Sequence, residues 1–289
     1  MDQTITNQRQ TTIVPVMTTP AGSCLTPDNW YEIGKKVGSF NLCSLLLKPG
    51  YDLLISCVDL SSYVAWTDTL VLNATMPAPN KAGFYVLCSP YDGSRIQLSR
   101  EELVLLIRQL KPNIVLLPAE LSDCCSQFSS EIKVFISNLT VDMAPSHDCG
   151  IYFDVSAGKS WPDLMAALKQ YEQHETYVIG HFSMDQIIAL HEAGVTYVEI
   201  DRVASDACNG LVYHAQGVLS LHDNCHAYEF SLLDAKCTCP TCEQLLTRAY
   251  LHHLLTNTPL LCQRFLIQHN HYFTQLAIQG FPDGCRIEI

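Results

Sequence analysis

The feature that most constrains this chain is a cysteine cluster near its C-terminal end. Cys237, Cys239 and Cys242 fall within six residues, in a C-x-C-x-x-C pattern with a proline in its second gap. Spacing this short lets three thiolates converge on one point without help from the rest of the fold. A helical stretch follows, and His269 and His271 come after it. Three cysteines and one histidine make a complete tetrahedral ligand set, which is typical of a structural zinc ion with no open position for water.

The fourth ligand is open to two assignments. We predict His269, with His271 as the alternative, and we expect the adjacent His252 and His253 to lie in mid-helix against packing partners. The competing interpretation is that the cysteines are small buried hydrophobic residues, but three in six residues followed by two histidines argue against it. Thiolates also disfavour magnesium and calcium. The predicted ligands of one structural Zn²⁺ are Cys237, Cys239, Cys242 and His269.

The composition indicates a globular protein made in a reducing compartment. Of 289 residues, 48% are hydrophobic and 16% are charged, which excludes a disordered chain. No apolar run approaches the ~20 residues that cross a bilayer. The N-terminal sequence is polar and lacks the apolar core of a secretory signal. We therefore interpret the 14 cysteines as thiols and metal ligands, and expect a cytoplasmic protein.

Strands and helices are predicted to alternate along the chain. The predicted strands are residues 13–17, 40–47, 85–87, 113–117, 151–155, 177–179 and 195–200. The predicted helices are residues 26–38, one that begins at a capping box of Ser99 and Glu102, residues 162–173 and residues 184–193. This alternation predicts an α/β fold, a shortened (β/α)₈-type barrel with a C-terminal zinc-binding helical subdomain. We expect the barrel to span residues 1–230 and the subdomain residues 231–289.

Several motifs together resemble the tRNA-guanine (queuine) transglycosylase family. The cysteine cluster, the sequence TRAYLHHL at residues 247–254 and the His-Asn pair at residues 269–270 resemble the zinc subdomain of that family. Residues 177–210 match a family segment without a gap, and other family motifs follow in pieces. Two departures stand out. One extra residue lies in 243–246, and the glycine-rich loop that cradles the base in the family is missing between Asp154 and Tyr177.

The resemblance also identifies the positions of the family's catalytic residues. Glu199 stands where the family has its nucleophilic aspartate, Asn73 where it has the aspartate of a D-S-G-G-F-Q motif, and Ala119 where an aspartate reads the purine. Asn73 cannot act as an acid or a base, because its side chain is an amide. Glu120 is next to Ala119, and Asp201 is expected to share a strand face with Glu199. We interpret Asn73, Ala119 and Glu199 as degenerate positions and predict no catalytic site.

In this family the resemblance implies a role without catalysis. The eukaryotic queuine tRNA-ribosyltransferase is a heterodimer, and its accessory subunit keeps the zinc subdomain but lacks the active-site residues. We therefore expect a heterodimer with a catalytic transglycosylase paralogue, tRNA bound through the complex, and guanine-to-queuine exchange at the wobble base. The net charge of −12 agrees, because 17 basic against 29 acidic residues give a chain that binds RNA weakly alone.

Two other functions stay open from the sequence. One is an active, diverged transglycosylase that uses Glu199, or Asp201 in its place, as the nucleophile. The other is a scaffold or nucleobase-binding protein without a role in tRNA modification. For the accessory subunit, the resemblance leaves open an association with the mitochondrial outer surface through the complex, although the sequence shows no membrane anchor.

Overall fold

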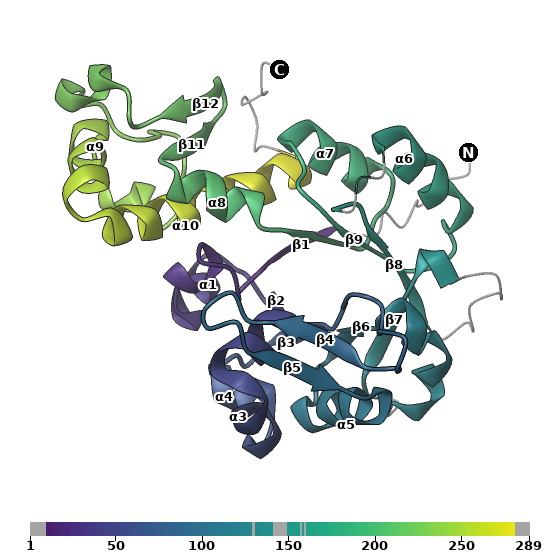
Figure 1. The fold of residues 1–289 in the computed structure, drawn as a ribbon. Coiled ribbons are helices and arrows are strands. Elements are labelled where there is room, and N and C mark those ends of the chain that lie inside the picture. The colour runs from purple at the N-terminus through teal and green to yellow at the C-terminus, as the bar shows by residue number, and fades with distance from the viewer. Residues whose placement is uncertain (1–9, 129–130, 141–148, 157, 159, 281–289) are drawn as a thin grey trace, which may run out of the picture. The chain divides into compact units, whose positions relative to one another are not determined.

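The computed structural model describes residues 10–128, 131–140, 149–156, 158 and 160–280 (Figure 1). The chain forms two compact units that interleave along the sequence. Unit 1 comprises residues 1–18, 37–181 and 189–199, and unit 2 comprises residues 19–36, 182–188 and 200–289. The boundary that we expected at residue 230 stays a prediction.

Unit 1 contains a barrel of eight strands in the order β1-β10-β9-β8-β7-β6-β3-β2. The strands are β1 (Thr12–Pro15), β2 (Val37–Asn41), β3 (Thr69–Asn73), β6 (Ile114–Leu116), β7 (Lys133–Ser137), β8 (Gly150–Asp154), β9 (Thr176–Ile179) and β10 (Tyr197–Ile200). Each pairing from β2 round to β10 is parallel. A parallel bridge between Val16 and Ser39 joins the end of β1 to β2 and nearly closes the ring. The predicted barrel fold is confirmed.

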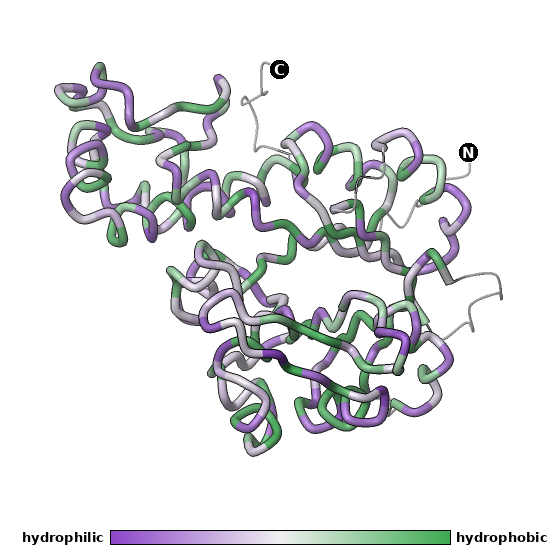
Figure 2. Tube along the Cα trace, viewed as in Figure 1, coloured by the Kyte–Doolittle hydropathy of each residue, from purple (hydrophilic) through white to green (hydrophobic). Residues whose placement is uncertain are grey.

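Aromatic and branched side chains fill the inside of this barrel, and hydrophobic stretches follow the strands (Figure 2). The rings of Phe135 and Tyr177 meet edge to face with their centroids 5.6 Å apart, and Tyr177 stacks on Tyr197 at 5.6 Å. Such aromatic pairs add about 0.5–1.5 kcal/mol beyond the burial of their area. The remaining members of this buried cluster are Val14, Val71, Ile114, Leu116 and Tyr152.

Helices and one hairpin connect the strands. The helices are α2 (Leu42–Leu45), α3 (Tyr51–Ser56), α4 (Leu60–Val64), α5 (Arg100–Leu110), α6 (Trp161–Gln170) and α7 (Met184–Glu192), with short helical turns η2 (Leu46–Gly50), η3 (Ala119–Gln127) and η4 (Asn138–Thr140). Strands β4 (Tyr85–Cys88) and β5 (Arg95–Leu98) form an antiparallel hairpin in the connection from β3 to α5. Because β2 and β3 are parallel neighbours, the segments that follow them leave the barrel at its same, carboxyl-terminal end.

The predicted capping box opens α5. The Ser99 hydroxyl accepts from the Glu102 backbone N–H at 3.2 Å, and the Glu102 carboxylate accepts from the Ser99 N–H at 2.8 Å. We expect Ser99→Ala to lower the free energy of unfolding by about 1 kcal/mol, because one N–H of the first turn loses its acceptor. Ser99→Asp keeps an acceptor and should be near wild type. Urea unfolding measures both, and equal losses would contradict the capping role.

The predicted helix 26–38 and strand 40–47 are wrong in their bounds. Helix α1 (Pro27–Glu32) ends six residues early, where Gly34 takes a positive φ of 73°. The chain then forms β2 already at Val37. The apolar run from Leu42 is helical because the Asn41 side chain accepts from the Ser44 backbone N–H at 3.0 Å and so starts α2.

Unit 2 is mostly helical. Besides α1, its elements are η1 (Gly22–Cys24), α8 (Arg202–Cys208), β11 (Leu211–His214), β12 (Gly217–Ser220), η5 (Asn224–Tyr228), η6 (Cys242–Gln244), α9 (Arg248–Asn257) and α10 (Pro259–Gln279). Strands β11 and β12 pair antiparallel, and α10 packs against both α8 and α9. Across the described residues, no helix combines the length and apolar character that crossing a membrane requires.

Candidate functional site

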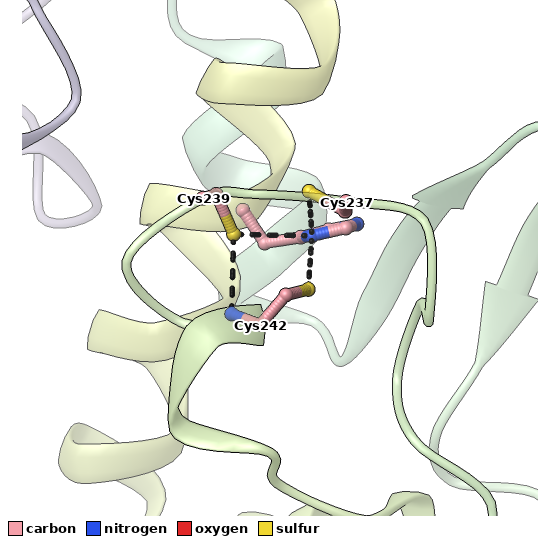
Figure 3. A group of neighbouring side chains, drawn as sticks. Cys237, Cys239 and Cys242 are labelled. Atoms are coloured by element: carbon pink, nitrogen blue, oxygen red, sulfur yellow. Dashed lines mark hydrogen bonds between the residues drawn. The ribbon is translucent and has the colours of Figure 1, made fainter.

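The four predicted metal ligands lie together in unit 2. Cys237 and Cys239 come from the loop before η6, Cys242 is its first residue, and His269 projects from α10. Figure 3 shows the three sulfur atoms around one imidazole nitrogen. The His269 Nδ1 lies 3.6, 3.6 and 3.3 Å from the sulfurs of Cys237, Cys239 and Cys242. All four ligand atoms lie within 4.8 Å of one another.

These distances fit a tetrahedral metal ion. With a Zn–S bond of 2.3 Å and a Zn–N bond of 2.0–2.1 Å, the nitrogen and each sulfur of a tetrahedron are about 3.6 Å apart. The cluster is also shielded, because Cys239 and His269 are fully buried. Hydrogen bonds from the neighbouring thiols of Cys237 and Cys242 lower the pKa of Cys239, which favours the thiolate form that binds metals. The residues present therefore fit one metal ion.

Surrounding contacts orient the ligands. The His269 Nε2 lies 2.8 Å from the backbone carbonyl of Tyr213, so the ring donates there and leaves Nδ1 free to face the sulfurs. The Thr241 hydroxyl donates to the carbonyl of Phe265 at 2.7 Å and ties the cysteine loop to α10. The Cys242 backbone N–H points at the Cys239 sulfur at 3.3 Å. Helix α10 thus carries His269 and also holds the loop that carries the three cysteines.

His271, the alternative ligand, faces elsewhere. Its ring is fully buried and lies edge-on to Trp30, with the centroids 4.9 Å apart. Neither of its nitrogens has a hydrogen-bond partner among the described residues. Burial lowers the pKa of His271 well below its ordinary value, so the neutral ring is favoured. The His252 Nδ1 donates to the Leu221 carbonyl, 2.7 Å away, and is likewise outside the cluster.

Glu199 lies inside the barrel of unit 1, near the end of β10, with only 3% of its surface exposed. Its Oε2 accepts from the hydroxyls of Ser39 at 2.7 Å and Tyr177 at 2.6 Å. Its Oε1 accepts from the amide of Asn73 at 2.8 Å. Burial raises the pKa of Glu199 above its ordinary value, and the hydrogen bonds from the three donors lower it in part. One carboxylate thus joins four strands, β2, β3, β9 and β10.

The structure brings two of the three degenerate positions into contact. Asn73 is the last residue of β3, and its Oδ1 accepts from the backbone N–H and the hydroxyl of Thr75 at 3.1 and 2.7 Å. This fixes the amide so that its NH₂ group faces Glu199. Ala119 is the first residue of η3 and offers no polar side-chain atom.

Asp201 does not share a strand face with Glu199, because β10 ends at Ile200. Asp201 instead precedes α8 and accepts from the Thr19 hydroxyl at 2.5 Å. Ser39 and Tyr177 were missed as partners of Glu199 by the sequence reasoning. Ser39 lies 160 positions from Glu199 in the chain, so only closure of the barrel brings them together.

Comparison with known proteins identifies the relatives of this chain. A family model described as queuine tRNA-ribosyltransferase matches residues 156–281, which include the whole ligand cluster. The queuine tRNA-ribosyltransferase of Idiomarina loihiensis is 23% identical over 94% of this chain and 85% of its own length. Residues 156–281 thus match the tRNA-guanine transglycosylase family. The queuine tRNA-ribosyltransferase of Treponema denticola is also 23% identical, over 94% of this chain and 85% of its own length.

The identity is higher over a shorter stretch of the chain. The queuine tRNA-ribosyltransferase of Novosphingobium aromaticivorans is 32% identical over 104 residues, 36% of this chain and 28% of that protein. The metal ligand cluster and the barrel are both present in this chain. Glu199, which we interpret as the degenerate nucleophile position, is buried and accepts hydrogen bonds from Ser39, Asn73 and Tyr177.

Proposed function

We propose that the chain is the non-catalytic accessory subunit of a heterodimeric queuine tRNA-ribosyltransferase. Its catalytic paralogue would exchange guanine for queuine at the wobble position of tRNA. The match to the family supplies the reaction class. The observation that carries the proposal is the Glu199 carboxylate, which is buried and accepts hydrogen bonds from three neutral side chains.

Base exchange needs a carboxylate that can reach the ribose and a second group that moves a proton. If Glu199 attacked a ribose carbon, the donors Ser39, Tyr177 and Asn73 would lose their acceptor. Each buried donor left unpaired costs about 1–3 kcal/mol. Asn73 adds no acid or base, since its amide does not titrate. The geometry thus favours a carboxylate that holds the barrel together over one that reacts.

Exposed apolar side chains on unit 2 support an interface with a partner. Four large apolar side chains are exposed in two segments that run side by side, namely Tyr228 (85%), Phe230 (76%), Leu245 (67%) and Tyr250 (47%). The segments are joined by backbone hydrogen bonds, among them Ala249 N–H to the Glu229 carbonyl at 2.9 Å. Exposed apolar patches of this kind mark protein interfaces. We assign this patch, residues 228, 230, 245 and 250, to the catalytic paralogue.

We also propose zinc as the ion of the Cys₃His cluster, because three thiolates and one imidazole in tetrahedral array suit Zn²⁺ best. Bound zinc would supply structure alone, as a crosslink between the cysteine loop and α10. The loop leads directly into Leu245 and α9, which carry part of the exposed patch. The metal would therefore fix the surface that meets the paralogue.

The test is base exchange with labelled guanine and tRNA, using this chain alone, the catalytic paralogue alone and the two together. We expect no turnover from the chain alone and more turnover from the mixture than from the paralogue. Glu199→Gln should leave the mixture's turnover unchanged. Phe230→Asp should abolish the stimulation together with co-elution of the two proteins.

Two outcomes would overturn the proposal. Turnover by the isolated chain that is lost in Glu199→Gln would establish an active enzyme with Glu199 as nucleophile. No co-elution with a transglycosylase and no stimulation would instead favour a scaffold or nucleobase-binding protein.

A further inference from the structure

Exposed cations are few in this acidic chain, and several of them are already paired. Arg100, Lys133, Arg202 and Arg248 each form an ion pair with a carboxylate. Lys48, Lys81 and Arg95 are exposed and form no ion pair with a carboxylate of the described residues. All three belong to the segments that follow β2 and β3. These segments start from the carboxyl-terminal end of the barrel, where Asn73 also lies.

One of these cations, Lys48, lies over an exposed aromatic ring. The Lys48 Nζ lies 3.5 Å from the centroid of the Tyr91 ring, at the turn of the β4–β5 hairpin. Tyr91 is 65% exposed, so the lysine covers one face and leaves most of the ring open. Arg95 is the first residue of β5, on the other side of the same turn, and lies opposite Cys88 of β4 in the hairpin. At the other end of the hairpin, Lys81 and the exposed ring of Phe84 share a second turn closed by Asn80.

The turn that carries Tyr91 is held in shape. The Ser89 N–H donates to the Ser94 carbonyl at 2.8 Å, and Gly93 N–H donates to the Ser89 carbonyl at 3.0 Å. The Asp92 carboxylate accepts from the backbone N–H and the hydroxyl of Ser94, at 3.1 and 2.8 Å. These serine hydrogen bonds lower the pKa of Asp92 to about 2, so this one acid is ionised but engaged within the turn. Tyr91 is thus presented on a fixed loop.

We propose that the β4–β5 hairpin and Lys48 form an RNA-binding surface for the unpaired bases and backbone of a tRNA loop. This proposal rests on the proposed function, which makes tRNA the ligand of the complex. Proteins bind single-stranded nucleic acid with cations along the backbone and aromatic rings on which bases stack. Lys48, Lys81 and Arg95 supply the cations, and the open face of Tyr91, with Phe84, supplies the stacking surface.

The test uses the heterodimer with the paralogue, and measures KM for tRNA, KM for guanine and kcat. We expect Tyr91→Ala to raise the tRNA KM about tenfold, the effect of losing one stacked base, while KM for guanine stays unchanged. Tyr91→Phe keeps the ring and should match wild type. The double variant Lys48→Glu/Arg95→Glu should raise the tRNA KM and make its salt dependence shallower. Lys169→Glu, a single charge reversal at an exposed position of α6, is the control and should leave the tRNA KM unchanged.

Two results would overturn this surface. One is an unchanged tRNA KM in both hairpin variants while the heterodimer stays intact, and the other is a loss of heterodimer assembly in Tyr91→Ala. If the wild-type mixture shows no stimulated exchange, the proposed function fails. A direct measurement of RNA binding then tests the role of the hairpin separately. Fluorescence anisotropy of a labelled anticodon stem-loop with the chain alone should then show binding that Tyr91→Ala weakens. Equal binding by both proteins would refute the RNA-binding role.

Discussion

Removal of the metal ion is expected to unfold much of unit 2. Apparent binding free energies for structural zinc are about 10–16 kcal/mol near neutral pH, which exceeds the whole stability of many domains. In this chain the ion would link the loop of Cys237 and Cys239 to His269 in α10. Without it, the three sulfurs face one imidazole with only weak contacts. A strong chelator should therefore lower the thermal unfolding temperature sharply.

Replacing one metal ligand at a time should also cause loss of the metal and of stability. Cys239→Ser should lose the bound metal and most of the stability of unit 2, because serine is a poor zinc ligand. Cys225→Ser, at an exposed cysteine outside the cluster, is the matched control and should be within about 0.5 kcal/mol of wild type. His269→Ala should lose the metal, whereas His271→Ala should keep it. Elemental analysis by mass spectrometry measures the metal, and calorimetry measures the unfolding.

A stoichiometric metal ion in purified Cys239→Ser would contradict the ligand assignment. So would metal loss in His271→Ala with retention in His269→Ala, since it would transfer the fourth position to His271. An unchanged unfolding temperature after complete metal removal would show that packing of α10 alone holds the subdomain.

Local features of this fold were predictable from the sequence because each depends on residues close together in the chain. The capping box of Ser99 and Glu102 needs only a spacing of three. The cysteine cluster needs only a short loop, and the barrel follows from the alternation of strands and helices. The bounds near residues 33–45 were missed because Gly34 and Asn41 act through backbone conformation and a cap that hydrophobic patterning does not contain.

The surroundings of Glu199 could not be predicted, because they depend on contacts across the barrel. Asn73 is 126 positions away in sequence and Ser39 is 160 positions away. Which strand faces point inward, and whether the ring closes through β1, decides whether these side chains meet. The sequence led us to interpret Glu199 as degenerate, but only the structure shows its hydrogen bonds to three other strands.

Replacing Glu199 by alanine is expected to destabilise unit 1 by about 3 kcal/mol or more. The variant leaves the buried hydroxyls of Ser39 and Tyr177 and the amide of Asn73 without their acceptor, and it opens a cavity among four strands. Glu199→Gln keeps the size and one acceptor oxygen, so its loss should be about 1 kcal/mol. Chemical unfolding of the two variants measures the difference, and equal losses would argue that volume rather than hydrogen bonding matters.

The stability of wild type and of Glu199→Gln should depend differently on pH. Burial raises the pKa of Glu199 above its ordinary value of 4.5. Between the pKa of the unfolded chain and that of the folded chain, Glu199 is protonated in the folded chain and ionised in the unfolded one. The stabilisation is complete below pH 4.5 and is lost as the pH rises through the folded-state pKa, by up to about 1.4 kcal/mol per pH unit. We expect wild type to lose stability relative to Glu199→Gln over that range. Protonation of the metal ligands at low pH affects both proteins alike and cancels in the difference. A difference that stays constant from pH 4.5 to 8 would mean that Glu199 is ionised throughout, held so by its three donors.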